Sequence, residues 1–237
     1  GNRKRGIGRY CLEFTKELIN CYPENEYVLF TNSALLDLRN DFINELNNPK
    51  LNLIYFKCPI VGDMNQGYVG IYSKLWLSTQ LRSYSLSIIN TELILITSFF
   101  DGFRDNTLVS HDRSFKLPPI VSIIYDLIPL IYSDQYLNFD PEQKLFYFQK
   151  VKELSNLDAL LAISESSLKE ASKYLDINPE FIYNISSACD QKKFSPRSSK
   201  SNINREFLGR FLLYCGATDP RKNLYRLIEA YASLPLH

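Results

Sequence analysis

Short apolar runs of four to six residues recur along the chain without a regular polar alternation. They are rich in Ile, Leu, Val and aromatic residues, a composition typical of strands that are buried on both faces of a parallel sheet. On this basis strands are predicted at Tyr27–Phe30, Leu51–Phe56, Leu93–Thr97, Ile120–Tyr125, Ala159–Ile163, Phe181–Ile185 and Phe211–Cys215.

Segments with a helical period lie between these runs. Apolar side chains recur every three to four residues in 7–21 and again in 224–231, which predicts two amphipathic helices. Further helices are predicted at 34–47, 68–87, 141–156 and 167–175, the last with Ser167 and Glu170 as a capping box. The alternation of strands and helices predicts an α/β fold with a Rossmann-like parallel sheet and flanking helices.

The stretch from Asp190 to Glu206 is polar, rich in Ser and Asn, and has no periodicity, which predicts a linker over 190–206. It separates a domain at 1–189 from one strand and one helix at 207–237, which cannot bury a core of their own. A Gly-rich turn also opens the chain with no strand before it. We therefore expect a chain that is trimmed at both ends, with its second Rossmann-like domain truncated.

The composition indicates a globular protein, with 45% hydrophobic and 22% charged residues. A net charge of +1 gives no reason to expect a nucleic-acid partner. The five cysteines are scattered and form no C-x-x-C motif, so we interpret them as reduced core thiols of a cytoplasmic protein. No apolar run is long enough to span a bilayer, and two histidines leave no room for a His-rich metal site.

The opening turn, GNRKRGIGRY, places three glycines and four cations at the start of a helix. Cations there oppose the helix dipole, unless an anion such as phosphate binds at the same place. We therefore predict a phosphate site at Gly6 and Gly8. A solvated basic turn is the alternative.

The closing turn has the same character, since Arg221 and Lys222 precede an apolar-striped helix. Gly216 follows a predicted strand and would let a ligand approach the main chain, and Asn223 is a candidate helix cap. Two such basic turns, one in each predicted domain, suggest a diphosphate held in the cleft between the domains. For each cation, an exposed surface residue is the alternative.

Two further turns carry polar groups directly after apolar strands. Asp126 follows one strand, where ligands of open parallel sheets bind, and is a candidate base or acceptor for a sugar hydroxyl. A turn or cap role beside Pro129 is its alternative. Tyr125, Ser164 and Glu165 are placed on the acceptor or sugar side, with helix capping as the alternative for the serine turn.

Six stretches, in this order, resemble the family 4 glycosyltransferases, which have the GT-B fold of two facing Rossmann-like domains. They are RKRGIGRY (Arg3–Tyr10), FFDGFRDN (Phe99–Asn106), IIYDLIPLIY (Ile123–Tyr132), LLAISESSLKEA (Leu160–Ala171), NISSACD (Asn184–Asp190) and YCGATDPRKNLYRLIEAYASLP (Tyr214–Pro235). Within that family the sequence is most similar to bacterial enzymes that build surface polysaccharide, mannosyl- and rhamnosyltransferases among them.

The resemblance implies retaining transfer from a nucleotide-sugar donor to a saccharide or lipid-linked acceptor, with no cofactor and no metal. It implies that Lys222, with Arg221 beside it, binds the donor diphosphate and that Gly6 and Gly8 face the same phosphates. The leaving diphosphate gains negative charge, so its stabilisation is the main electrostatic task.

Two substitutions depart from the family pattern, and one motif is missing. Tyr125 stands where many members have His, and Ala217 stands where many have a diphosphate-binding Arg. The family's E-x7-E motif belongs beyond residue 237, so we expect the isolated chain to be inactive.

The expected location is the cytoplasm, with peripheral docking at the inner face of the membrane left open along with the oligomeric state. The alternative function is a non-catalytic, degenerate GT-B-like binding or scaffold module, which Tyr125 and Ala217 favour. A Rossmann dehydrogenase is disfavoured because its glycine fingerprint is missing.

Overall fold

The computed structural model describes residues 6–33, 48–59, 62, 69–103, 105–189, 194, 211–216 and 222–235. Compact packing divides the chain into two units, Gly1–Ala188 and Cys189–His237. The helix predicted at 34–47, Arg221 and Ala217 lie outside the described residues, as does the predicted linker apart from Phe194. The domain boundaries at 189 and 206 stay predictions.

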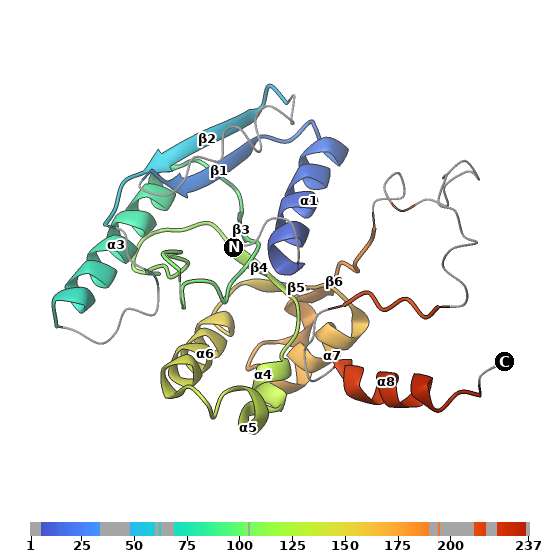
Figure 1. The fold of residues 1–237 in the computed structure, drawn as a ribbon. Helices are drawn as coiled ribbons and strands as arrows, with labels where there is room; N and C mark the ends of the chain where they lie inside the picture. The colour runs from blue at the N-terminus through green and yellow to red at the C-terminus, as the bar shows by residue number, and fades with distance from the viewer. Residues whose placement is uncertain are drawn as a thin grey trace. The chain divides into compact units, whose positions relative to one another are not determined.

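The described strands of the first unit pair in parallel, as the sequence predicts (Figure 1). A two-stranded sheet pairs β1 (Tyr27–Asn32) with β2 (Leu51–Phe56). A second sheet has the order β3-β4-β5-β6. Its strands are β3 (Ile94–Ile96), β4 (Ile120–Ile124), β5 (Ala159–Ala162) and β6 (Ile182–Asn184). This mixed α/β architecture confirms the predicted fold class.

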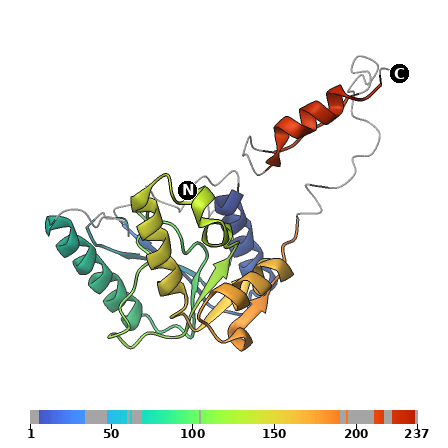
Figure 2. The ribbon, with the colours of Figure 1, turned by 90° about the horizontal axis from the view of Figure 1, so that it is seen from below.

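Helices connect and cover these strands. They are α1 (Gly6–Cys21), α3 (Val69–Ile88), α4 (Ile128–Ile131), α5 (Ser133–Tyr136), α6 (Pro141–Leu154), α7 (Glu165–Tyr174) and the 3-10 turn η1 (Pro179–Phe181). Figure 1 and Figure 2 together show α6 and α7 on one face of the four-stranded sheet. This is the expected arrangement for two successive parallel crossovers in the same direction.

The core of the unit is centred on β4, whose five residues are all buried. Ile120 and Ile124 of this strand pack in one cluster with three fully buried residues, Leu160 of β5, Leu154 of α6 and Leu127. A strand with neighbours on both sides and helix packing on its face has no solvent-facing position. This explains why the sequence of β4 shows no polar alternation.

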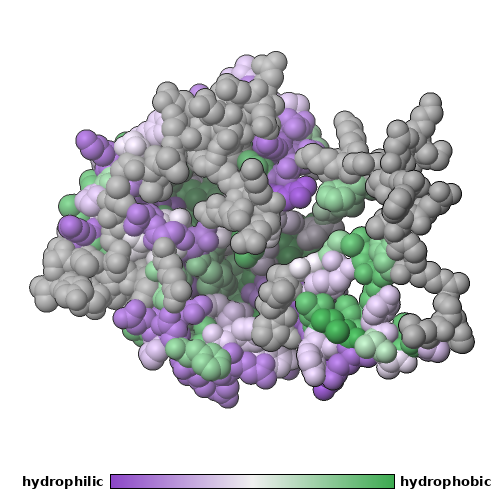
Figure 3. Space-filling view, in the orientation of Figure 1, coloured by the Kyte–Doolittle hydropathy of each residue, from purple (hydrophilic) through white to green (hydrophobic). Residues whose placement is uncertain are grey.

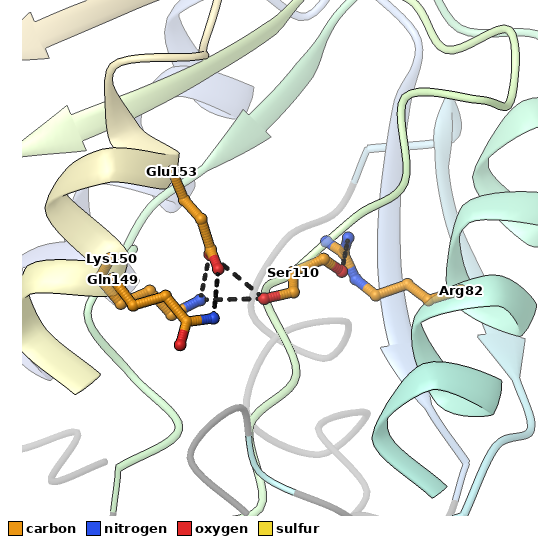
Figure 4. Close-up of polar contacts among 5 residues, drawn as sticks. All are labelled: Arg82, Ser110, Gln149, Lys150 and Glu153. Atoms are coloured by element: carbon orange, nitrogen blue, oxygen red, sulfur yellow. Dashed lines mark hydrogen bonds and ion pairs between the residues drawn. The ribbon is translucent and has the colours of Figure 1, made fainter. Parts of the chain in front are cut away.

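One buried charge ties α6 to the segment before β4 (Figure 4). The side chain of Lys150 is 1% exposed, and its Nζ donates to Ser110 Oγ at 3.2 Å and to Glu153 Oε2 at 3.1 Å. The ammonium also lies 5.1 Å from the ring centre of Phe99. Arg82 of α3 donates to the Ser110 carbonyl, so the same segment is held from a second helix. Pairing and hydrogen bonds of this kind offset the free-energy cost of removing a charge from water.

The predicted capping box of α7 is wrong. Ser164 is the N-cap residue, and its Oγ accepts a hydrogen bond from the Ser167 amide at 3.1 Å. Glu170 instead accepts from the Leu127 amide. The helix begins at Glu165, two residues before the predicted start at 167, because the Ser164 side chain binds an amide ahead of the first apolar position.

The five cysteines are free thiols, but the prediction that they lie in the core is wrong for three of them. Cys58 is buried and Cys11 is partly buried, whereas Cys21, Cys189 and Cys215 are exposed. A cysteine beside a few apolar residues in the sequence can lie in the core, on the exposed side of a helix or in a segment without strand pairing, so the local sequence does not predict its burial.

In the second unit, residues 224–231 form the predicted helix as part of α8 (Leu224–Ala232). The strand predicted at Phe211–Cys215 is not found, since residues 211–215 carry no strand assignment. Within the described part of this unit no neighbouring strand supplies the ladder hydrogen bonds that a strand needs. Figure 3 shows a hydrophobic surface over this unit, to which exposed Leu213 and Ile228 contribute.

Candidate functional site

Polar residues gather at the carboxyl edge of the four-stranded sheet. Thr97 follows β3, Tyr125 and Asp126 follow β4, Ser164 follows β5 and Ser187 follows β6. The carboxyl ends of parallel strands form one edge, which is where open α/β sheets bind ligands. The structure therefore brings together the first-unit residues that were predicted on the acceptor or sugar side.

The first turns of α1 lie against this edge. Tyr125 Oη donates to the Thr97 carbonyl at 2.9 Å, and Cys11 Sγ lies 3.1 Å from Tyr125 Oη and 3.3 Å from the same carbonyl. The ring of Tyr10 meets the ring of Tyr125 edge-on, with centres 5.3 Å apart. Tyr10 also forms a hydrogen bond with Ser187, which donates to the Ile163 carbonyl.

Burial makes the two phenols of this cluster hard to ionise. It raises the pKa of the Tyr125 hydroxyl, and the contact with Cys11 acts in the same direction. Burial also raises the pKa of Tyr10, against the effect of the Ser187 hydrogen bond. Both phenols therefore stay neutral and keep their protons for hydrogen bonding.

Asp126 is exposed at the edge, and its Oδ1 accepts a hydrogen bond from the Ile128 amide at 3.1 Å. That contact spans two residues and is the turn role that the sequence leaves as the alternative. The carboxylate also lies close enough to Tyr147 to contribute, after burial, to the raised pKa of that phenol. A catalytic role for Asp126 stays a prediction.

The serine turn after β5 is organised as a helix cap. Ser164 caps α7, and Ser167 Oγ donates to the Tyr125 carbonyl at 2.6 Å. Glu165 accepts from Asn184 Nδ2 at 3.3 Å and pairs with Lys169 at 3.6 Å on the helix surface. The capping alternative thus accounts for Ser164, while contacts of Ser164 and Glu165 with a sugar stay predictions.

Asp101 is a polar residue of this region to which sequence reasoning assigns no role. It is half-buried after β3, and burial raises the pKa of its carboxyl group despite a hydrogen bond from Ser98. Gly102 follows with φ at 103°, a conformation that favours glycine. The signal was present in the sequence: an Asp-Gly pair five residues after an apolar strand, at the same edge as Asp126.

The two glycines predicted to bind phosphate lie in the first turn of α1, which is open at Gly6. Gly6 has φ at 58°, and a Cβ added there would meet no atom within 4 Å. Gly8 lies in the first turn of the helix and is only partly exposed. The cations Arg3, Lys4 and Arg5 lie outside the described residues, so their contribution to a phosphate site stays a prediction.

The second-unit residues lie around the start of α8. Asn223 is the N-cap residue with φ at 50°, but its side chain makes no cap hydrogen bond. Lys222 precedes it and is exposed. A Cβ added to Gly216 would lie 2.6 Å from the Tyr214 hydroxyl, so this glycine allows the phenol to fold back over it. Phosphate binding by these residues stays a prediction.

The chain is similar to known proteins over almost its whole length, although no protein-family model matches it. A serotype-specific mannosyltransferase WbdA of Escherichia coli is 28% identical over 240 residues, which cover 99% of this chain and 28% of that protein. Two further serotype-specific mannosyltransferases WbdA of Escherichia coli are 33% identical over 159 residues, which cover 65% of this chain and 19% of each. The chain therefore spans less than a third of the length of the curated relatives that it matches.

Proposed function

We propose that this chain is part of a family 4 glycosyltransferase of GT-B fold that transfers a sugar, with retention of configuration, from a nucleotide-sugar donor to a saccharide or lipid-linked acceptor. The observation that carries the proposal is the similarity to mannosyltransferases along 99% of the chain. The parallel sheet with a polar carboxyl edge supports it, because ligands of this fold class bind at that edge. Mannose is accordingly the first donor sugar to test.

The assigned roles follow the chemistry of the residues. Lys222, with Arg221, Asn223 and Gly216, is proposed to bind the donor diphosphate, where a cation stabilises the leaving group. The Gly6–Gly8 turn is a second candidate for phosphate contact, since its main chain is open to solvent at Gly6. Asp126 is proposed to accept a hydrogen bond from a sugar hydroxyl at the sheet edge.

The test is a transfer assay on the gene product that contains residues 1–237. We expect transfer from one member of a panel of nucleotide sugars that includes mannosyl donors, with acceptors prepared both as free saccharides and as lipid-linked saccharides. The anomeric configuration of the product, measured by NMR, should equal that of the donor. Activity should survive EDTA, because no metal is proposed. A protein that binds the acceptor but transfers no sugar would support the scaffold alternative instead.

We also propose that this protein docks peripherally on membranes through α3. The buried side of this helix carries polar residues beside the core residue Leu86, since Ser78 and Ser83 are fully buried and Arg82 is 8% exposed. They bind the Pro59 carbonyl, the Asp112 amide and the Ser110 carbonyl, so hydrogen bonds attach the helix to its unit together with the packing of Leu86 in the core.

Several large apolar side chains on the other side of α3 are exposed to solvent. Trp76 and Ile88 are each 65% exposed, and Tyr84 is 54% exposed. The helix sequence has no Asp or Glu, and exposed Lys74 lies on the outward arc. Trp, Tyr and Lys on the exposed side of a helix without Asp or Glu suit an anionic lipid interface.

A vesicle assay tests the docking proposal. Replacing Trp76 and Ile88 together with serine should abolish cosedimentation of the protein with vesicles of phosphatidylcholine and phosphatidylglycerol. The matched control is Phe139→Ser, which removes an apolar side chain that is 86% exposed elsewhere. Equal cosedimentation of the double variant and the wild type, or equal loss in the control, would rule out α3 as the docking surface.

A further inference from the structure

We propose that Tyr125 is a positioning residue, which holds the first turns of α1 on the carboxyl ends of β3 and β4 rather than contacting a sugar. The proposal rests on the proposed function only for its effect on donor binding. The juxtaposition itself rests on contacts between residues far apart in the chain, since Tyr125 is 114 residues from Cys11 and 28 from Thr97.

The Tyr125 hydroxyl proton is already used in a hydrogen bond to the protein's own main chain. A phenol and a thiol each carry one proton to donate, and a carbonyl oxygen accepts two. Tyr125 donates to the Thr97 carbonyl at 2.9 Å, while Cys11 reaches both that carbonyl and the phenol oxygen within 3.3 Å. The three groups form a closed cluster that joins α1, the end of β3 and the end of β4.

The main chain of Tyr125 is fixed from the opposite side. Ser167 Oγ of α7 donates to the Tyr125 carbonyl at 2.6 Å, and the Leu127 amide donates to Glu170. Because the main chain is held by α7 and the hydroxyl by Thr97, the ring cannot turn toward a ligand without breaking the cluster. The edge-on contact with Tyr10 adds a further restraint on the ring.

The helix segment held in this way begins at the glycine turn. Gly8 is two residues before Tyr10 and three before Cys11, so the cluster sets where the first turn of α1 stands over the sheet edge. If the amides of that turn bind phosphate, a looser first turn costs donor affinity without removing any group from the reaction. Tyr125 would then influence binding through α1 alone.

The first readout is independent of enzymatic activity. In the Tyr125→Phe variant of the gene product, alkylation of Cys11 by iodoacetamide should be about 3- to 10-fold faster, the factor that one lost hydrogen bond supplies. The ring and its contact with Tyr10 are retained, so the fold should survive. Mass spectrometry of the peptides also gives the rates at exposed Cys21 and Cys189, which should not change.

The second readout is kinetic. The KM for the nucleotide-sugar donor should rise by a similar factor with kcat little changed, the signature of lost ground-state binding. Tyr183→Phe, which removes an exposed hydroxyl from β6, is the matched control and should change neither quantity. Cys11→Ala should also raise the donor KM, whereas Cys11→Ser retains a donor and should keep the KM close to that of the wild type.

Three outcomes would overturn the proposal. They are an unchanged Cys11 alkylation rate in Tyr125→Phe, a fall in kcat with an unchanged donor KM, and an unchanged donor KM beside faster alkylation. The fall in kcat would mean that the hydroxyl touches the reacting groups. If the wild-type protein transfers no sugar, the proposed function fails, and the alkylation rates still decide whether Tyr125 holds α1.

Discussion

Replacing Lys222 with alanine is expected to lower the kcat/KM of sugar transfer by about 100-fold, a loss typical for removal of one preorganised charge from a developing anion. Lys222 is exposed just before α8, and α8 presents the positive end of its helix dipole at the same place. Negative charge on the diphosphate grows as the sugar leaves, so the ammonium stabilises the transition state more than the bound donor. Most of the loss should therefore appear in kcat, measured with saturating acceptor.

Two variants control this prediction. Lys222→Arg keeps the charge and should retain most of the activity, whereas Lys152→Ala removes an exposed lysine of α6 and should have no effect. A Lys222→Ala protein with wild-type kcat/KM would show that the lysine is a surface cation, which is the alternative that the sequence leaves open. A loss in Lys222→Ala that is matched by Lys152→Ala would point to general electrostatics instead.

The strands of the first unit could be predicted because burial dominates their sequences. β4 and its neighbour β5 are apolar without alternation, and that pattern has few explanations other than a covered parallel sheet. The run at Phe211–Cys215 has the same composition and is not a strand, because pairing is supplied by neighbours rather than by the run itself. Local composition therefore indicates which segments are able to form a strand. Whether such a segment pairs with a neighbouring strand depends on distant residues that the sequence alone does not place beside it.

Helix starts and polar contacts are harder to predict, because they too depend on which groups meet in the folded chain. The cap of α7 depends on which serine side chain accepts a hydrogen bond from a main-chain amide. Ser164 and Ser167 are the same residue type, so the sequence does not distinguish them. At the site, the sequence predicts Tyr125 and Asp126 from their place after a strand. It gives no hint that Cys11 and Tyr10 meet Tyr125, since these contacts join residues more than a hundred positions apart. Asp101 was missed although its position after β3 follows the rule that identified Asp126.

Lowering the pH from 7.5 to 5 is expected to reduce the free energy of unfolding by about 2 kcal/mol through His111 alone. Burial lowers the pKa of His111 from 6.5 to about 4, and the charges of Arg82 and Arg113 act in the same direction. In the unfolded chain His111 therefore binds a proton as the pH falls through 6.5, whereas in the folded chain it binds this proton only near pH 4. Stability is full above pH 6.5 and falls as the pH drops through that window, because the unfolded state takes up more protons. Urea denaturation at each pH measures the change.

The matched variant is His111→Gln. Carboxyl groups that titrate in the same range contribute equally to both proteins, so subtracting the two pH profiles of the free energy of unfolding leaves the contribution of His111. Its stability can be lower at every pH, but it should lack the His111 part of the slope between pH 7.5 and 5. The chain has two histidines, so NMR can follow the imidazole of His111 beside that of His237. An imidazole of His111 that titrates near 6.5 in the folded protein, or equal slopes in both proteins, would contradict the prediction. Either result would mean that water or a carboxylate reaches the ring, and that solvent screens the charges of Arg82 and Arg113 near His111.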